Sequence, residues 1–213
     1  MSNMNTDELL KQYTEGERTF RGAKLYKADL RCQDLGGINL NKSKLAGANL
    51  SGANLSRASL IETDFFLKVS YTLERVDHSG SEGSNLSGAN LSEANLDRAD
   101  LAYADLSEAN LSQTNLTSTN LTDANLTGAN LTGARLVDAA LCYADLTGAD
   151  LTGADLTSAY LNEANLSGAD LSKVSLREAN LTKANLSGAK LSGVDLSRAK
   201  LSGARMPNGT IHD

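Results

Sequence analysis

The sequence predicts an all-β fold in which the chain winds into a solenoid, and three observations support this. Leucine recurs every five residues: 32 of the 36 leucines lie on one grid, unbroken from Leu25 to Leu60 and from Leu86 to Leu201. Phe20, Phe65 and Met206 extend the grid to 35 positions, and alanine stands two residues before 25 of them. The 213 residues include no tryptophan, three phenylalanines and one proline, which excludes an ordinary mixed core.

A period of five suits neither common element. On an α-helix, five steps of about 100° would scatter the leucines around the axis. On a flat strand, an odd period sends successive leucines to opposite faces. The pattern closes if the chain turns a corner once per unit, with alanine and leucine inward, Asn or Asp outward, and Ser/Thr-Gly at the bend. We therefore predict stacked coils, joined by backbone hydrogen bonds around a column of buried leucine.

The repeated unit resembles that of the pentapeptide-repeat family, A(D/N)LXX, over about four-fifths of the chain. Its C-terminal tail resembles those of cyanobacterial members. The resemblance implies a right-handed quadrilateral parallel β-helix with four units per coil, hence about nine coils and a rod of ~42 Å at roughly 4.8 Å per coil. Where Ile38, Val174 or Val194 replaces the inward alanine, we expect local bulging or compensation in a neighbouring coil.

We expect a single pentapeptide-repeat domain over the whole chain. Its parts are an N-terminal cap helix, a first repeat block, an extruded loop, a second repeat block and a C-terminal tail, at residues 1–16, 17–65, 66–83, 84–206 and 207–213.

The start of the chain predicts a short helix from about Asp7 to Glu15. Asn5 is a good N-cap residue, and acidic residues follow it in the first turn. Leu9, Leu10 and Tyr13 then follow at the spacing of one helix face. Because an open solenoid end must be covered, we expect this helix to lie over the first coil.

The far end of the solenoid leaves two alternatives open. The tail after Met206 is turn-like and too short for a capping helix. Either the tail covers the last coil and the protein is a monomer, or the last coil pairs end to end with a second copy.

The repeat is interrupted between Phe65 and Leu86. The step there is 21 residues, which is not a multiple of five, so the intervening segment must leave the helix. If Leu86 follows Phe65 directly in the solenoid, about 16 residues are extruded as a loop. This loop is either a tolerated surface insertion or a binding element carried on a rigid scaffold.

No pattern of residues predicts catalysis. His78 has Asp and Ser as sequence neighbours, which cannot form a triad with it. Cys32 and Cys142 match no metal-ligand spacing, and no phosphate-binding or dinucleotide motif occurs. We expect no catalytic, cofactor-binding or metal-ligating residue.

The charge along the chain is organised. Residues 100–170 carry ten acidic residues and one basic residue, whereas residues 173–205 carry seven basic and two acidic ones. Asp145, Asp150 and Asp155 are predicted to lie on three successive sides of one coil. Some members of the family resemble duplex DNA and bind type II topoisomerases, so this acidic waist is either a DNA-mimicking surface or a solvated face.

The surface aromatic residues also follow a pattern. With residues twenty apart stacked, Tyr103, Tyr143 and Tyr160 share one side of the rod, and Phe66 joins them if the loop is excised cleanly. Either these are scattered substitutions in a drifting repeat, or they form a candidate interaction surface together with Tyr71 of the loop and the three aspartates above.

The sequence therefore favours a non-enzymatic scaffold that binds an unidentified protein partner. The alternative is a DNA-mimicking modulator of a type II topoisomerase such as gyrase, and a third possibility is an enzyme that uses the 66–83 loop. The net charge of −6 argues against direct binding of nucleic acid. No secretory leader or membrane span is expected, which favours a cytoplasmic location.

Overall fold

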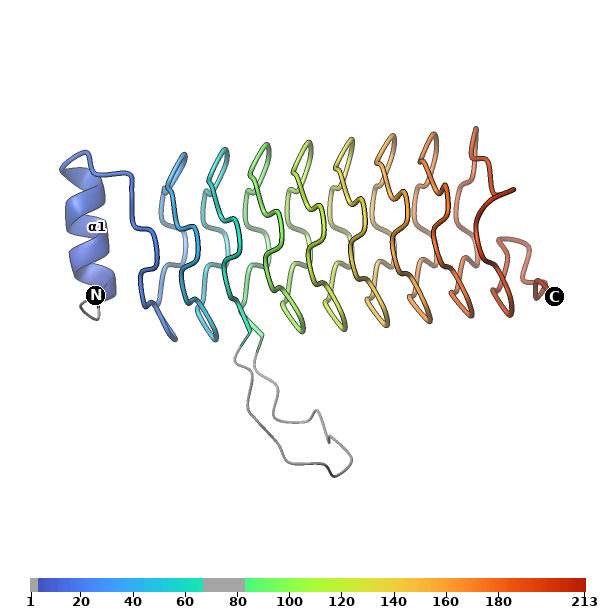
Figure 1. Ribbon diagram of the computed structural model, residues 1–213, viewed down its shortest axis with the longest axis horizontal. Helices are drawn as coiled ribbons and strands as arrows, with labels where there is room; N and C mark the ends of the chain where they lie inside the picture. The colour runs from blue at the N-terminus through green and yellow to red at the C-terminus, as the bar shows by residue number, and fades with distance from the viewer. Residues whose placement is uncertain (1–3, 67–82) are drawn as a thin grey trace, which may run out of the picture.

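In the computed structural model, which describes residues 4–66 and 83–213, the leucine grid forms the inner surface of a right-handed β-helix (Figure 1). One α-helix, α1 (Thr6–Thr14), stands at its N-terminal end. The described residues form no extended strand, because each side of a coil contributes one parallel bridge between two corners.

The bridges fix four repeat units per coil. Each described bridge within the second repeat block joins residues twenty apart, as Asn110 to Asn130 and Asn125 to Asp145. A leucine-position N–H donates to the next coil on every regular side, as Leu111 N does to Asn130 O at 2.7 Å. The predicted quadrilateral helix is therefore confirmed.

The ladder crosses the interruption in register. Asn49 pairs with Asn85 and Asp64 with Asp100, offsets of 36 instead of twenty. Phe66 and Gly83 form an antiparallel bridge where the two repeat blocks meet. These offsets exceed twenty by sixteen residues. The step from Phe65 to Leu86 exceeds the five-residue period by the same number. Residues 67–82 of the proposed 66–83 loop, Tyr71 and His78 among them, lie outside the described residues.

The interior is a column of leucine lined by small side chains. The grid leucines from Leu25 to Leu186 that the structure describes are at most 2% exposed. Five hydroxyl residues replace the inward alanine and are fully buried: Ser43, Thr63, Ser84, Thr114 and Thr119. Each donates to a backbone carbonyl of a preceding coil, as Thr119 Oγ1 does to Leu96 O at 2.8 Å. A polar group thus enters the core without losing its hydrogen bond.

The corners differ from the expectation that glycine and small polar residues make the bend. Before the last coil, the second residue after the leucine has a positive φ, as in a type II turn, whatever its side chain. Nineteen non-glycine residues hold this conformation, among them Lys42, Arg57 and Tyr143. The inter-coil ladder imposes the bend, so residues that rarely adopt a positive φ are held there at a local cost.

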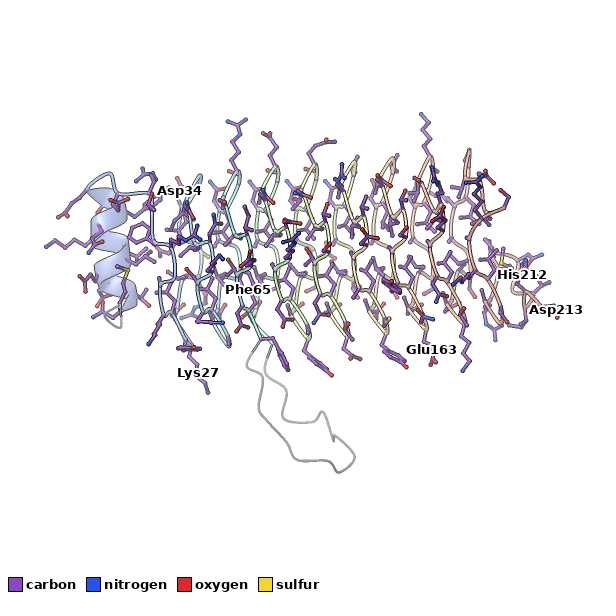
Figure 2. All side chains as sticks on the ribbon, in the orientation of Figure 1. Lys27, Asp34, Phe65, Glu163, His212 and Asp213 are labelled. Carbon is purple, nitrogen blue, oxygen red and sulfur yellow. The ribbon has the colours of Figure 1, made fainter. Side chains whose placement is uncertain are left out.

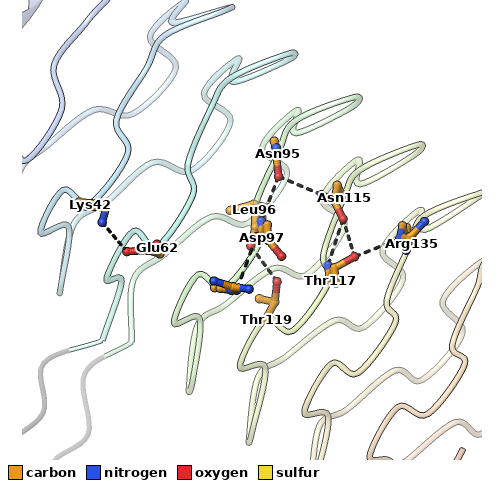
Figure 3. A network of polar contacts seen from close by, with 10 residues as sticks. Lys42, Glu62, Asn95, Leu96, Asp97, Asn115, Thr117, Thr119 and Arg135 are labelled. Atoms are coloured by element: carbon orange, nitrogen blue, oxygen red, sulfur yellow. Dashed lines mark hydrogen bonds and ion pairs between the residues drawn. The ribbon is translucent and has the colours of Figure 1, made fainter.

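The outward Asn and Asp residues stabilise the corners by hydrogen bonds. Each side-chain oxygen accepts from the backbone N–H two residues later, and asparagine amides reach the neighbouring coil. Figure 3 shows Asn95, whose Oδ1 accepts from Asp97 N at 3.1 Å and from Asn115 Nδ2 at 3.0 Å. Thr117 continues the network by accepting from Arg135 Nε at 3.1 Å.

Helix α1 covers the first coil as predicted. Asn5 caps it by accepting from Glu8 N at 2.8 Å, and Leu9 is fully buried against the core. The Tyr13 hydroxyl donates to Gly36 O at 2.8 Å, and the Arg18 guanidinium lies 3.8 Å above the Tyr13 ring. The helix is therefore attached by the buried Leu9, by the partly buried Leu10 and Tyr13 that also pack against the core, and by the polar contacts of Tyr13.

The C-terminal tail folds back on the last coil. Ile211 forms an antiparallel bridge with Arg205, and Met206 N donates to Thr210 O at 2.7 Å. The tail pairs with this one side of the coil, while Leu191 and Leu196 on two other sides stay partly exposed.

The expected bulging at oversized inward residues occurs at one of three places. Ile38 is fully buried within an intact ladder, and Arg18, not a core side chain, precedes it in the stack, so the alternative expectation of compensation in a neighbouring coil applies there. The ladder also holds between Val174 and the coil before it. It opens where Val194 stacks on Val174.

Candidate functional site

One side of the rod collects the surface aromatic residues of the described solenoid. It is the side whose core residues include Leu25, Phe65 and Leu101, and we call it the aromatic side. The bridges place five aromatic residues on it: Tyr26, Phe66, Tyr103, Tyr143 and Tyr160. The other three described sides carry no aromatic residue on their outer surface. Figure 2 shows Lys27 and Glu163, corner residues of the aromatic side, on one edge of the rod, and Phe65 in its interior.

The aromatic side chains differ in how far they are ordered by neighbours. Tyr26, Tyr143 and Tyr160 are each about half exposed. Phe66 and Tyr103 form a pair whose ring centroids lie 5.2 Å apart. Partial burial of Tyr103, and then the charge of Asp123, which also accepts a hydrogen bond from the hydroxyl, raise the pKa of Tyr103. Tyr103 therefore remains a neutral hydrogen-bond donor at physiological pH.

Small apolar residues lie between these rings: Ala102 and Cys142 follow a leucine, where most units carry serine or threonine, and Ala140 precedes one, where most units carry Asn or Asp. Ala102 is buried, and Ala140 and Cys142 are half-buried. Burial raises the pKa of the Cys142 thiol, so it packs as a neutral side chain. The aromatic side thus carries a strip of exposed aromatic and small apolar side chains along the rod.

The three aspartates of the candidate surface lie in one coil but on three different ladders. Asp145, Asp150 and Asp155 pair with residues of the next coil on successive sides. Each carboxylate accepts from the backbone N–H two residues later, at 2.9 to 3.0 Å. The structure therefore gives these side chains a role in the corners and does not gather them with the aromatic residues.

No arrangement suited to catalysis or metal binding is found in residues 4–66 and 83–213. No group of three or more His, Cys, Asp or Glu side chains is placed to hold a metal ion there. Cys32 and Cys142 are free thiols on separate coils. In the same part of the chain, no helix has the length and apolar character needed to cross a bilayer.

The sequence did not predict a shallow pocket at the C-terminal end of the aromatic side. It has a volume of about 310 Å³, and we call it the terminal pocket. Its lining residues are Ser158, Tyr160, Glu178, Asn180, Arg198 and Lys200. The twenty-residue stacking of Tyr160, Asn180 and Lys200 was the signal that could have revealed it.

Comparison with known proteins agrees with this architecture. The family model for pentapeptide repeats matches in eight copies, and the matched ranges together cover residues 34–66 and 82–208. No curated protein matches the chain.

Among solved structures, the chain is similar to HetL, a pentapeptide repeat protein involved in heterocyst differentiation regulation from the cyanobacterium Nostoc sp. strain PCC 7120. The identity is 36%, the match covers 99% of this chain and 100% of HetL, and the TM-score is 0.55.

Two further structures match at lower similarity. QnrB1, a plasmid-mediated fluoroquinolone resistance protein, is 22% identical over 89% of this chain and 91% of its own, with a TM-score of 0.39. Rfr23 from the cyanobacterium Cyanothece 51142 is 24% identical over 92% and 97%, with a TM-score of 0.27. With the repeat model matching most of the sequence and HetL aligned along its whole length, the chain belongs to the pentapeptide-repeat family.

Proposed function

We propose that this protein is a non-catalytic scaffold that binds a protein partner along its aromatic side and acts by regulating that partner. A rod held by a continuous ladder offers a rigid surface, which limits the conformational entropy lost on binding. The main chain is already fixed, so a partner has to order only the exposed side chains.

The single observation that carries the proposal is the gathering of Tyr26, Phe66, Tyr103, Tyr143 and Tyr160 on one of four sides. Aromatic residues are enriched in the energetically important centres of protein interfaces. Exposed tyrosines combine a large apolar area with a hydroxyl that can donate or accept.

The regulatory part of the proposal draws on the likeness to HetL. That protein is described as involved in regulating heterocyst differentiation, and this chain aligns with all of it. A regulatory rod without catalytic groups acts by occupying a surface of its partner.

Site-specific photo-crosslinking tests the proposal. A benzophenone amino acid replaces Tyr143 in one variant and Gln113 in another, and each variant is irradiated in an extract of the organism that encodes the chain. Gln113 holds the same corner position on the opposite side, with a φ of 58° against 62° at Tyr143. We expect a discrete crosslinked partner from position 143 and none from position 113. Equal products from both positions, or none from position 143, would contradict the proposal.

The acidic waist supports a second candidate, a DNA-mimicking modulator of gyrase. Ten acidic residues lie between Asp100 and Asp170. Lys183 pairs with Glu163 at 3.6 Å and Lys190 pairs with Asp170 at 2.9 Å. These ion pairs make the C-terminal edge of the waist less negative. A gyrase supercoiling assay decides this candidate: protection from an inhibitor, or inhibition, supports it, and no effect at micromolar protein removes it.

A further inference from the structure

The last coil departs from the stack on one side. On regular sides, the leucine-position N–H and the N–H two residues later both donate to the next coil, as Leu156 N and Ser158 N do. Leu176 and Glu178 hold the equivalent positions one coil later, yet neither N–H has a backbone acceptor in the described chain. No described bridge joins Ser175 to the next coil either.

The hydrogen bonds between the two coils are missing on this side of the described chain, whereas those within the neighbouring turns are kept. Val194 N still donates to Leu191 O at 3.2 Å, and Ala199 N to Leu196 O at 3.0 Å. We call the side between residues 175–178 and 195–198 the open side. In Figure 1 the last coil, drawn in red, is less regular than those before it.

Two stacked valines account for the opening. Val194 stands above Val174 at the inward position that is alanine in 25 of 35 units. Two β-branched side chains in successive coils crowd a space built for methyl groups, so the outer coil shifts. Arg198 above Glu178 also lacks the positive φ that Glu178 holds at 61°.

The terminal pocket lies beside the open side and carries positive charge. Arg198 and Lys200 line it, and neither lies within 4.0 Å of a carboxylate in the described residues, although the charge of Arg198 also acts on nearby Asp195. The one acidic residue in the lining, Glu178, lies 3.4 Å from Arg177, which offsets its charge. Tyr160 is half exposed at its other edge. A pocket of this kind attracts carboxylates and offers an aromatic surface next to them.

The acidic waist limits what can reach this pocket. Asp155 lies in the same coil as Ser158 and Tyr160, and further acidic residues of the waist precede it, so an extended polyanion such as a nucleic acid would be repelled as it continued along the rod. A short acidic peptide segment can meet the two basic side chains without following the rod further.

We propose that the terminal pocket and the open side bind an extended, acidic segment of a protein partner. Its carboxylates pair with Arg198 and Lys200, and one of its backbone carbonyls accepts from the N–H group of Glu178, an exposed residue of the pocket lining. This inference rests on the proposed function, since it gives the chemistry of one segment of the partner.

The first test measures binding of a fluorescent peptide of alternating glutamate and valine to the full chain by anisotropy. We expect saturable binding that weakens at least about tenfold when Arg198→Glu and Lys200→Glu are combined, because two charge-assisted hydrogen bonds are lost. The same peptide with glutamine in place of glutamate should bind equally weakly. Lys24→Glu is the control, at the same repeat position and on the same side as Lys200 but at the other end. Thermal melting confirms that the variants are folded.

The second test closes the open side. Val194→Ala restores the small inward residue, so Leu176 and Glu178 amides should exchange more slowly with solvent and the peptide should bind at least about threefold more weakly. Absence of saturable binding to the natural chain, or binding unchanged by the Arg198 and Lys200 reversals, would overturn the inference. Tyr143→Ser should leave peptide binding intact, which separates this inference from the proposed function.

Discussion

At the residue scale, the meaning of each side chain follows from its place among the five positions of the unit. Leucine at the centre is buried, the residue before it is outward, and the second residue after it is forced to a positive φ. The sequence predicts the first two assignments because hydrophobicity separates inward from outward. It does not predict that Tyr143 or Ser118 occupies a left-handed corner, since that conformation is imposed by the neighbouring coils.

The strain at the corners can be measured at Ser118, whose φ is 54°. We expect Ser118→Gly to raise the free energy of unfolding by about 1 kcal/mol, because glycine adopts this conformation without a steric penalty. Ser92→Gly is the control, one position earlier in its corner and without a positive φ; it should lower stability by roughly 0.5–1 kcal/mol. Urea denaturation compares the two, and equal effects would show that the corners are unstrained.

Gly83 is required for a different reason, the close approach of two backbones. A Cβ atom at this position would collide with the carbonyl group of Tyr103. Gly83→Ala should therefore destabilise the protein by about 1–3 kcal/mol. At Gly36 the nearest atoms are 3.5 Å or more from the corresponding point, so Gly36→Ala should be near neutral. Equal thermal stability of the two variants would exclude this packing.

The ionised side chain of Asp170 should make the stability of the protein depend on pH. Hydrogen bonds from Ser172, then the ion pair with Lys190, hold the pKa of Asp170 below its ordinary value of 3.8. The folded state therefore favours the ionised form, and this stabilisation is present above about pH 4 and is lost as the pH falls through the lower, folded-state value. Asp170→Asn should make the melting temperature less dependent on pH below about pH 4. An unchanged pH dependence would show that the pairing contributes nothing.

At the element scale, the two ends of the rod are closed by different means. Helix α1 was predictable from its N-cap and the spacing of its apolar residues, since both signals are local. The open side at the last coil could be predicted only in part. Val174 and Val194 indicated crowding, but the sequence could not show which inter-coil hydrogen bonds would be lost. The terminal pocket depends on this outcome, because the shifted coil carries Arg198.

The attachment of α1 rests mainly on Leu9. We expect Leu9→Ala to cost about 2–5 kcal/mol, since a fully buried side chain is truncated over the first coil. Hydrogen exchange should then accelerate first in the coil that contains Leu25. Leu10→Ala is the matched control, because Leu10 is only partly buried and should cost less. Uniform acceleration along the rod would contradict a local cap.

At the scale of the whole molecule, the regular repeat allows the fold to be predicted from the sequence but does not indicate the function. The leucine grid specified the core, the four-unit coil followed from resemblance, and the sixteen-residue excess fixed the register across the interruption. The aromatic side was predictable because stacking follows arithmetic once the coil length is known. The identity of its partner was not predictable, because the repeat determines only this protein's surface of the interface and not the surface of the partner.

The rod is expected to be a monomer. Its tail pairs with the side that includes Arg205, and residues 173–205 carry seven basic and two acidic side chains, so two such ends repel one another. Light scattering should give a mass near 22.4 kDa at high protein concentration and moderate salt. A stable dimer that resists dilution would instead favour end-to-end pairing.

The most direct test of the central claim is the affinity of the crosslinked partner, once isolated, for three forms of the chain. We predict that Tyr103→Ser combined with Tyr143→Ser weakens binding at least about tenfold, since buried aromatic side chains dominate interface energetics. Gln113→Ser on the opposite side should leave the dissociation constant unchanged. Equal affinity of all three forms would show that the aromatic side is not the partner surface.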